Sequence, residues 1–133
     1  MIGLDTNLLV RYLTRDDASQ YAKATALIDA AAKRGDRFVI NSAVLCELVW
    51  VLRTTYQYSR EEIGRTLEHI LTTAEFDVER SDEARQALHD FQSTKADFSD
   101  ALIGRINRSL GADHTVTFDR NLKPLETFRV VSS

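Results

Sequence analysis

The sequence predicts an α/β fold in which a largely parallel sheet is covered by helices on both faces. Short apolar segments alternate with amphipathic segments of helical period along the whole chain. The only proline is Pro124, so nothing interrupts the helical patterns before it. This alternation is typical of right-handed βαβ crossovers. A length of 133 residues suffices for one domain with a sizeable core, and we expect a single domain over residues 1–133.

Each expected strand is a short apolar segment. The expected strands are residues 1–4 (MIGL), 37–41 (RFVIN), 76–79 (FDVE), 114–119 (HTVTFD) and 128–131 (FRVV). Helical spacing of apolar side chains defines the first three helices, which are residues 6–14, an alanine-rich segment from 18 to Gly35, and residues 42–56. A capping box, SREE at 59–62, opens the next helix, which runs through Leu71. Ser81 is the expected N-cap of a helix over 81–91, and the last patterns are a helix at 97–111 and a short helical turn at 121–125.

Composition excludes several classes of protein. The chain is 44% hydrophobic and 28% charged, with a net charge of −3, and it lacks the basic footprint of many nucleic-acid-binding proteins. No apolar run is long enough to span a membrane, and the first residues do not form a signal peptide. A single cysteine, Cys46, rules out an intrachain disulfide. We therefore expect a cytoplasmic protein.

Acidic residues follow the strands. Asp5 comes directly after the first expected strand and Asp119 after the fourth, so both are expected at the same edge of a parallel sheet, where ligands bind. Glu47 lies about two turns into the helix after the second strand. Asp97 and Asp100 open the helix that precedes the fourth strand. These connections are expected to deliver acids to one rim of the sheet.

Taken singly, most of these acids have a structural explanation. Asp5 and Asp97 could cap helices, Asp100 could interact with the helix dipole, and Asp119 could be a turn residue. Glu47 has no such role, because it stands among apolar side chains. A buried carboxylate without a partner costs several kcal/mol, so Glu47 either pairs, reaches an edge or binds a cation.

Taken together, the acids indicate a metal site. Like charges about 4 Å apart cost roughly 4 kcal/mol per pair at an effective dielectric near 20, so the cluster needs cations. Mg²⁺ is commonly held by carboxylates, waters and substrate phosphate, and such a site suits phosphodiester hydrolysis. Other chemistries lack their signatures: the chain has no phosphate-binding glycine motif, no G-x-S-x-G elbow, and no zinc spacing at its histidines, which are His69, His89 and His114.

The segments GLDTNLLVRYLTRDD, CEL, ADFSDALIGR and TFDR, in this order and spacing, closely resemble the PIN-domain family and, within it, VapC-type toxins of bacterial toxin–antitoxin pairs. The resemblance covers essentially the whole chain. It implies a three-layer α/β/α sandwich with a central, mainly parallel sheet. It also implies an endoribonuclease that uses Mg²⁺, or Mn²⁺ as a substitute, to hydrolyse RNA phosphodiesters by a metal-activated water.

Carried over position by position, the resemblance assigns roles to several residues. The implied catalytic and metal-binding set is Asp5, Glu47, Asp100 and Asp119. The small polar or auxiliary positions around that set are Thr6, Asn7, Asp97 and Thr117. Gly104 stands where family members often have alanine, and it is expected to mark close backbone packing. Arg120 and Lys95 are candidate phosphate contacts, with a solvated surface role as the alternative.

The resemblance also implies partners, namely an RNA substrate, a second copy of the chain in a homodimer, and a small antitoxin whose tail covers the active site. We expect an apolar antitoxin segment on the helices around Leu9, Leu13 and Leu27, with an arginine near the carboxylates. Three alternatives remain: a receiver-like signalling domain, a haloacid-dehalogenase-like phosphatase and a catalytically idle RNA-docking module. The receiver needs a lysine after its last strand, and the phosphatase needs an acid where Asn7 stands.

Overall fold

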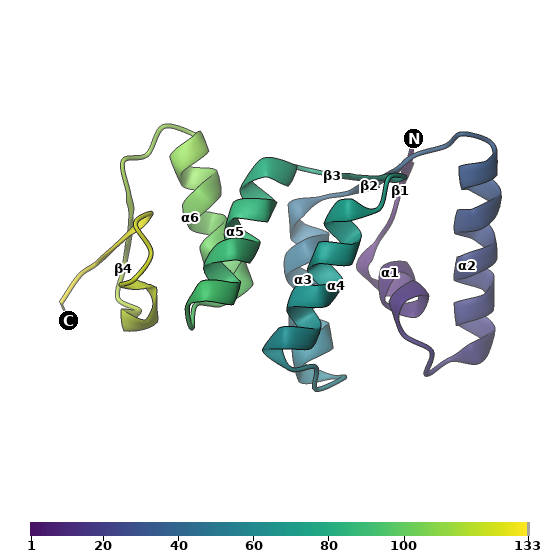
Figure 1. Ribbon diagram of the computed structural model, residues 1–133, viewed down its shortest axis with the longest axis horizontal. Helices are drawn as coiled ribbons and strands as arrows, with labels where there is room; N and C mark the ends of the chain where they lie inside the picture. The colour runs from purple at the N-terminus through teal and green to yellow at the C-terminus, as the bar shows by residue number, and fades with distance from the viewer. Residues whose placement is uncertain (133) are drawn as a thin grey trace. The chain divides into compact units, whose positions relative to one another are not determined.

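The computed structural model describes residues 1–132. Helices and strands alternate along the chain as predicted (Figure 1). Every strand pairing among the described residues is parallel. The α/β class is thus confirmed. The chain divides into two compact units, one formed by residues 1–58 and 69–79 and the other by residues 59–68 and 80–132. Helix α4 (Arg60–Thr72) begins in the second unit and ends in the first.

The first unit is a three-stranded parallel sheet with its connecting helices. Its strands, in spatial order, are β1 (Ile2–Gly3), β2 (Phe38–Ile40) and β3 (Phe76–Val78). Its helices are α1 (Thr6–Leu13), α2 (Ala18–Lys33) and α3 (Ser42–Thr54). Beyond β1, the amide of Leu4 still donates to the carbonyl of Val39 at 3.0 Å. The extended chain therefore continues to Asp5, which is delivered at the carboxyl end of the sheet.

The core of the first unit is formed by aliphatic and aromatic side chains. They lie at the inward-facing positions of the strands, which recur every second residue, and of the helices, which recur every 3.6 residues. The largest fully buried members of this core are Leu9, Phe38, Ile40, Leu45, Leu48, Leu52 and Ile70. The rings of Phe38 and Phe76 meet edge to face, with centroids 6.2 Å apart. This packing fixes α1 and α3 against the sheet, and these are the helices that carry Asp5 and Glu47.

The second unit packs two helices with a two-stranded sheet. Its elements are α5 (Ser81–Ser93), α6 (Phe98–Ser109), β4 (Thr115–Thr117), the 3₁₀ helix η1 (Arg120–Leu122) and β5 (Phe128–Val130). Helices α5 and α6 run alongside each other (Figure 1). Among residues 1–132, strand β4 pairs only with β5, so the strands of this part of the chain belong to two parallel sheets, one in each unit.

Two helix starts test the capping predictions. The capping box is confirmed, because the hydroxyl of Ser59 accepts from the amide of Glu62 at 3.1 Å and the Glu62 carboxylate accepts from the amide of Ser59 at 2.9 Å. The prediction that Ser81 caps α5 is wrong. The N-cap is Arg80, whose φ of 52° is left-handed and whose side chain makes no capping bond. The left-handed turn moves the helix start by one residue, so Ser81 lies inside α5.

Gly104 allows α6 to approach β5 closely, as the sequence suggested. A Cβ atom at this position would lie 2.5 Å from a ring carbon of Phe128 and 2.7 Å from the hydroxyl of Thr127. Thr127 is only 1% exposed and has little room to move. We expect Gly104→Ala to lower the free energy of unfolding by up to about 2 kcal/mol, because an overpacking cost of about 1–3 kcal/mol exceeds the gain in helix propensity of about 1 kcal/mol.

Gly64 on α4 provides the matched control for this prediction. A Cβ there would meet only the side chain of Gln92, at 3.1 Å, and that flexible side chain can move away. Gly64→Ala should therefore leave stability unchanged or raise it by up to about 1 kcal/mol. Urea unfolding of both variants measures the difference. Equal stability of the two would contradict the close approach of α6 to β5.

Candidate functional site

Asp5 is placed by the short connection between β1 and α1. Its backbone is extended, with φ −89° and ψ 172°, and its Oδ1 atom accepts from the amide of Leu8 at 2.9 Å. Asp5 is thus the N-cap of α1, which was the structural explanation offered for this acid beside the metal site. The cap bond orients the carboxylate, and the other oxygen, Oδ2, accepts no hydrogen bond from any described residue. That oxygen is available to a cation.

Glu47 lies on the exposed side of α3. Its apolar helix neighbours Ala43 and Trp50 are exposed as well, and the Trp50 side chain is 57% accessible. The cost of burying an unpaired carboxylate therefore does not arise, and Glu47 reaches an edge, which is one of the three outcomes that the sequence left open. The buried face of α3 is formed instead by the leucines at 45, 48 and 52 and by Val49.

Glu47 lines a cavity of about 310 Å³, here called the α1–α3 cavity. Its lining residues come from α1, α3 and the turn after α3, and they are Thr6, Asn7, Val10, Arg11, Glu47, Val51, Thr55 and Tyr56. Three of the predicted polar residues, Thr6, Asn7 and Glu47, therefore line one cavity of the first unit. Thr6 is buried, whereas Asn7 is exposed.

In the second unit, three carboxylates lie close enough to repel one another. Burial raises the pKa of Asp100, and the negative charges of Asp97 and Asp119 raise it further. Asp97 occupies the N-cap position of α6, but its side chain makes no capping hydrogen bond. Asp100 lies in the first turn of the same helix. The carboxylates at the start of α6 and after β4 therefore form one acidic group.

Asp119 is held by its neighbours after β4. Its Oδ1 atom accepts from the amide of Asn121 at 2.9 Å, which makes Asp119 the N-cap of η1. Its own amide donates to the hydroxyl of Thr117 at 3.0 Å. Thr117 thus helps to position the backbone of the acid two residues after it, and its auxiliary role in a metal site stays a prediction. As with Asp5, Oδ2 of Asp119 accepts no hydrogen bond from residues 1–132.

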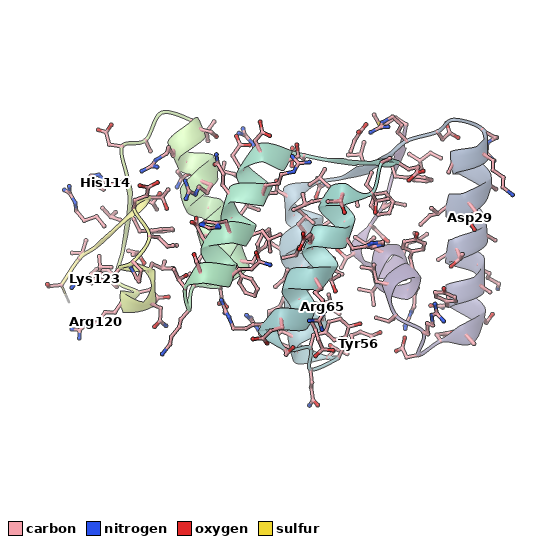
Figure 2. All side chains as sticks on the ribbon, in the orientation of Figure 1. Asp29, Tyr56, Arg65, His114, Arg120 and Lys123 are labelled. Atoms are coloured by element: carbon pink, nitrogen blue, oxygen red, sulfur yellow. The ribbon has the colours of Figure 1, made fainter. Side chains whose placement is uncertain are left out.

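The two candidate phosphate contacts belong to the second unit. Lys95 and Arg120 are both exposed, and Arg120 opens η1 next to Asp119 (Figure 2). Neither side chain forms an ion pair or a hydrogen bond with a described residue. Both cations are therefore free to meet a phosphate.

The acidic set is divided between the units. Asp5 and Glu47 belong to the first, whereas Asp97, Asp100 and Asp119 belong to the second. Within either unit, as far as residue 132, no three His, Cys, Asp or Glu side chains form a ready-made metal site. Convergence of Asp5 and Glu47 with the acids of the second unit therefore stays a prediction.

Sequence reasoning missed Arg11, which lines the α1–α3 cavity together with Glu47. Arg11 lies one helical turn after Asn7, and this i, i+4 spacing could have placed both on one face. Tyr56 lies two residues after the end of α3 and lines the same cavity. No sequence signal marks Tyr56, because its position depends on how α3 ends.

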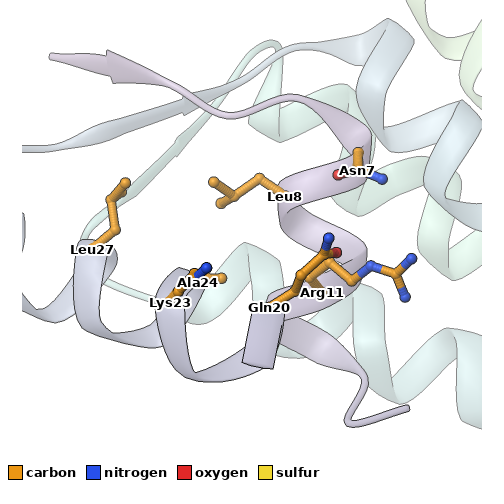
Figure 3. Close-up of a pocket in the computed structure, with 7 residues that line it drawn as sticks. All are labelled: Asn7, Leu8, Arg11, Gln20, Lys23, Ala24 and Leu27. Carbon is orange, nitrogen blue, oxygen red and sulfur yellow. The ribbon is translucent and has the colours of Figure 1, made fainter. Parts of the chain in front are cut away.

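A second hollow, here called the α1–α2 groove, has a volume of about 190 Å³ (Figure 3). Its lining residues are Asn7, Leu8, Arg11, Gln20, Lys23, Ala24 and Leu27. The expectation that Leu9 would meet a partner here is wrong, because Leu9 is fully buried and contributes to the core. Leu8, one position earlier, faces the groove instead, and Leu27 is 47% exposed. Leu13 does not line the groove.

Comparison with known proteins identifies the family. The PIN domain matches residues 2–126, which is most of the chain. The chain belongs to the PIN-domain family. A relative named VapC ribonuclease, from Aquifex aeolicus (strain VF5), is 26% identical to this PIN domain over 122 residues, which are 92% of the chain and 90% of the relative. PIN domains generally bind divalent metal ions, and PIN-domain nucleases are typically metal-dependent ribonucleases.

The raised pKa of Asp100 leads to a stability prediction. The folded state holds this proton more tightly than the unfolded chain, so the free energy of unfolding falls as the pH rises from the ordinary Asp pKa of about 3.9 through the raised value. The penalty is fully present above the raised pKa. We expect Asp100→Asn to raise the melting temperature of the metal-free protein at pH 7.

The stabilisation should shrink on acidification, because protonation relieves the same repulsion in the wild type. Asp113→Asn is the matched control, since Asp113 is an exposed acid of the same unit. Differential scanning calorimetry in chelator, at pH 7 and near pH 3, measures both variants. A lower melting temperature for Asp100→Asn at pH 7 would contradict the repulsion among these carboxylates.

Proposed function

We propose that the protein is a metal-dependent endoribonuclease and the toxin of a type II toxin–antitoxin pair. One observation of this molecule carries the proposal: burial and the negative charges of Asp97 and Asp119 all raise the pKa of Asp100. Such an arrangement is unfavourable for stability alone and favourable for holding a divalent cation. The PIN-domain match and the ribonuclease relative support the same activity.

The proposed metal site is formed by Asp5, Glu47, Asp100 and Asp119, with the two units acting as halves of a single domain. The donor set fits Mg²⁺ or Mn²⁺, because all of its groups are carboxylates and two of them keep an oxygen free of hydrogen bonds. When bound, the ion lowers the pKa of a water and offsets the negative charge of the phosphate. Glu47, on an exposed helix face, either binds the ion or positions the water.

The remaining polar residues have supporting roles in this proposal. Thr117 fixes the backbone of Asp119, while Thr6, Asn7 and Asp97 surround the carboxylates and orient ligands or water. Lys95 and Arg120, both exposed and unpaired within the described chain, are proposed to contact RNA phosphates and so to hold the scissile bond near the acids.

The activity is tested with purified protein and a mixture of single-stranded RNAs. We expect internal cleavage in Mg²⁺ or Mn²⁺ and none in excess EDTA. Cleavage should return when the chelated sample is supplied again with Mn²⁺, which separates metal dependence from irreversible damage. RNA that stays intact under all of these conditions, with protein that is folded by circular dichroism, would contradict the proposed activity and favour a docking module.

The α1–α2 groove is the proposed docking site for the antitoxin. Leu8, Ala24 and Leu27 offer an apolar surface to a segment of that protein, and an arginine of the segment is proposed to reach the carboxylates beyond Asn7. A homodimer in the cytoplasm is proposed from the resemblance to VapC-type toxins. No helix among residues 1–132 is long and apolar enough to cross a membrane.

Leu27→Asp tests the groove, because it places a charge on an exposed apolar position without touching the core. We expect the affinity for the cognate antitoxin to fall by a factor of about ten or more, since a buried unpaired carboxylate costs several kcal/mol, whereas RNA cleavage is unchanged. Leu110→Asp, at an exposed leucine outside the groove, is the control. Unchanged antitoxin affinity in Leu27→Asp would contradict docking in this groove.

A further inference from the structure

The α1–α3 cavity carries side chains that the proposed catalysis does not use. Arg11, Thr55 and Tyr56 line it together with Glu47, over a floor formed by Val10 and Val51. Every lining residue belongs to the first unit, so the cavity is complete within that unit. Its volume of about 310 Å³ lies in the range of small-molecule sites. The cavity therefore has both the size and the polar edges of a binding site.

Asp16 holds two of these side chains in place. Nη1 of Arg11 donates to the Asp16 carboxylate at 3.2 and 3.3 Å and to the hydroxyl of Tyr56 at 3.3 Å. The Tyr56 hydroxyl in turn donates to Asp16 at 2.9 Å, and Thr14 donates to the same carboxylate at 3.0 Å. The hydrogen bond from Tyr56 lowers the pKa of Asp16 most. The guanidinium and the phenol are thus fixed before any ligand binds, which reduces the entropy lost on binding.

The turn that presents Tyr56 has an unusual backbone. Gln57 adopts a φ of 55°, a left-handed conformation that glycine adopts more readily. The amide of Tyr58 donates to the carbonyl of Leu52 at 2.9 Å, which ties the end of this turn back to α3. Glycine would adopt the backbone of Gln57 at a lower cost, so the turn is not built for stability alone. Strain of this kind is often found at functional sites.

The chemistry of the lining favours a flat, polar-edged ligand. A phosphate fits poorly, because the Glu47 carboxylate lines the same cavity. An apolar side chain would make no use of the Arg11 guanidinium and the Asn7 amide, which both line the cavity. A nucleobase satisfies both: its faces pack on the aliphatic floor and the Tyr56 ring, and its edge offers both donors and acceptors to the arginine, amide and carboxylate.

We propose that the α1–α3 cavity binds one unstacked base of a single-stranded RNA, from the nucleotide beside the bond that is cleaved. This inference rests on the proposed ribonuclease function, because it uses the position of Glu47 at both the cavity and the metal site. The cavity then contributes to the choice of RNA, since only a nucleotide that can leave the stack reaches it.

The test uses a single-stranded RNA oligonucleotide with one mapped cleavage site. Nucleotides on both sides of the bond are replaced, one at a time, by abasic ribose. At one position the wild-type kcat/KM should fall about 5- to 150-fold, the range that corresponds to the loss of one stacked base, and at the others it should change little. Equal cleavage of every abasic RNA would overturn the proposal and leave the nuclease function intact.

Tyr56→Ala identifies the cavity as the place where that base binds. We expect the variant to lower kcat/KM for the complete RNA by a similar factor and to leave the sensitive abasic RNA unchanged. Tyr21→Ala is the control, because Tyr21 also packs against an arginine, with Arg15 4.9 Å from its ring centroid, but lies outside the cavity. Equal losses on both RNAs in Tyr56→Ala, or a change in antitoxin affinity alone, would overturn the assignment.

Fluorescence anisotropy of labelled RNA in chelator separates this inference from the proposed function, because binding does not require cleavage. Wild-type protein should bind the complete RNA more tightly than the sensitive abasic RNA, and Tyr56→Ala should bind the two equally. If no RNA is cleaved, the proposed nuclease function is wrong. In that case an abasic ribose is placed at each position of the oligonucleotide in turn, and only the binding affinity is measured. Equal binding of the complete and abasic RNAs by the wild type would overturn the cavity proposal in either case.

Discussion

Asp5→Asn is expected to lower the rate of RNA cleavage by a factor of about a thousand or more while leaving the fold intact. Stabilisation of charge by a bound metal ion contributes several kcal/mol to catalysis, and each 1.36 kcal/mol corresponds to a factor of ten in rate. Asparagine caps a helix about as well as aspartate, so the bond from the Leu8 amide to Oδ1 can persist. The substitution therefore removes the negative charge and retains the cap.

Asp17→Asn is the matched control for this variant. Asp17 caps α2 through a bond from the amide of Gln20 at 3.0 Å, in the same way that Asp5 caps α1, but it has no proposed part in metal binding. Cleavage rates of both variants are measured in saturating Mn²⁺, and urea unfolding checks their stability. If Asp5→Asn and Asp17→Asn cleave RNA equally well, Asp5 is a structural cap and the proposed metal site is wrong.

The second large effect is on stability, and it concerns the ion pair between α5 and α6. Nε and Nη2 of Arg105 donate to the two carboxylate oxygens of Asp90 at 2.8 and 2.9 Å, and Asp90 is only 5% exposed. The hydrogen bond to Asp90 raises the pKa of Arg105 further above its ordinary value. Asp90→Ala should lower the free energy of unfolding by about 3–5 kcal/mol, because the largely buried Arg105 would keep only the exposed Glu126, 3.7 Å from its Nη1 atom, as an ion-pair partner.

Two further variants give this prediction its controls. Asp82→Ala removes an exposed partner of Arg85, at 3.6 Å on the same helix, and should change stability by less than about 1 kcal/mol. A double variant, Asp90→Leu with Arg105→Met, removes both charges and should lose less stability than Asp90→Ala alone. Urea unfolding measures all three. A double variant that is less stable than Asp90→Ala would show that the charges themselves stabilise the pair of helices.

Local sequence patterns were sufficient to predict most elements of the fold. The capping box at Ser59 and Glu62 marked the start of α4, and the apolar spacing of α3 marked its length to within two residues. Local rules failed at Ser81, because the left-handed residue before it, Arg80, occupies the N-cap position without a side-chain cap bond. The pairing of the strands in two sheets depends on long-range contacts that no local pattern encodes.

The same distinction between local patterns and long-range contacts applies to the candidate site. The places of Asp5 and Asp119 were predictable, because each directly follows a strand and begins a helix. The exposure of Glu47 was not, since it depends on which side of an almost wholly apolar helix packs against the sheet. Arg11 and Tyr56 were missed for a related reason: their association with Asp16 joins the end of α1, the following loop and the end of α3.

The central claim, hydrolysis of RNA at a site that requires a divalent metal, is tested most directly by the chemistry of the product ends. A defined RNA is cleaved by the wild type in Mn²⁺, with Asp5→Asn in parallel to exclude a contaminating nuclease, and the termini are mapped by their reactivity with ligase, kinase and phosphatase. We predict a 5′-phosphate and a 3′-hydroxyl at the cut, formed only in the presence of metal and at a rate that Asp5→Asn reduces. Products that end in a 2′,3′-cyclic phosphate, or undiminished cleavage in excess EDTA, would contradict this account.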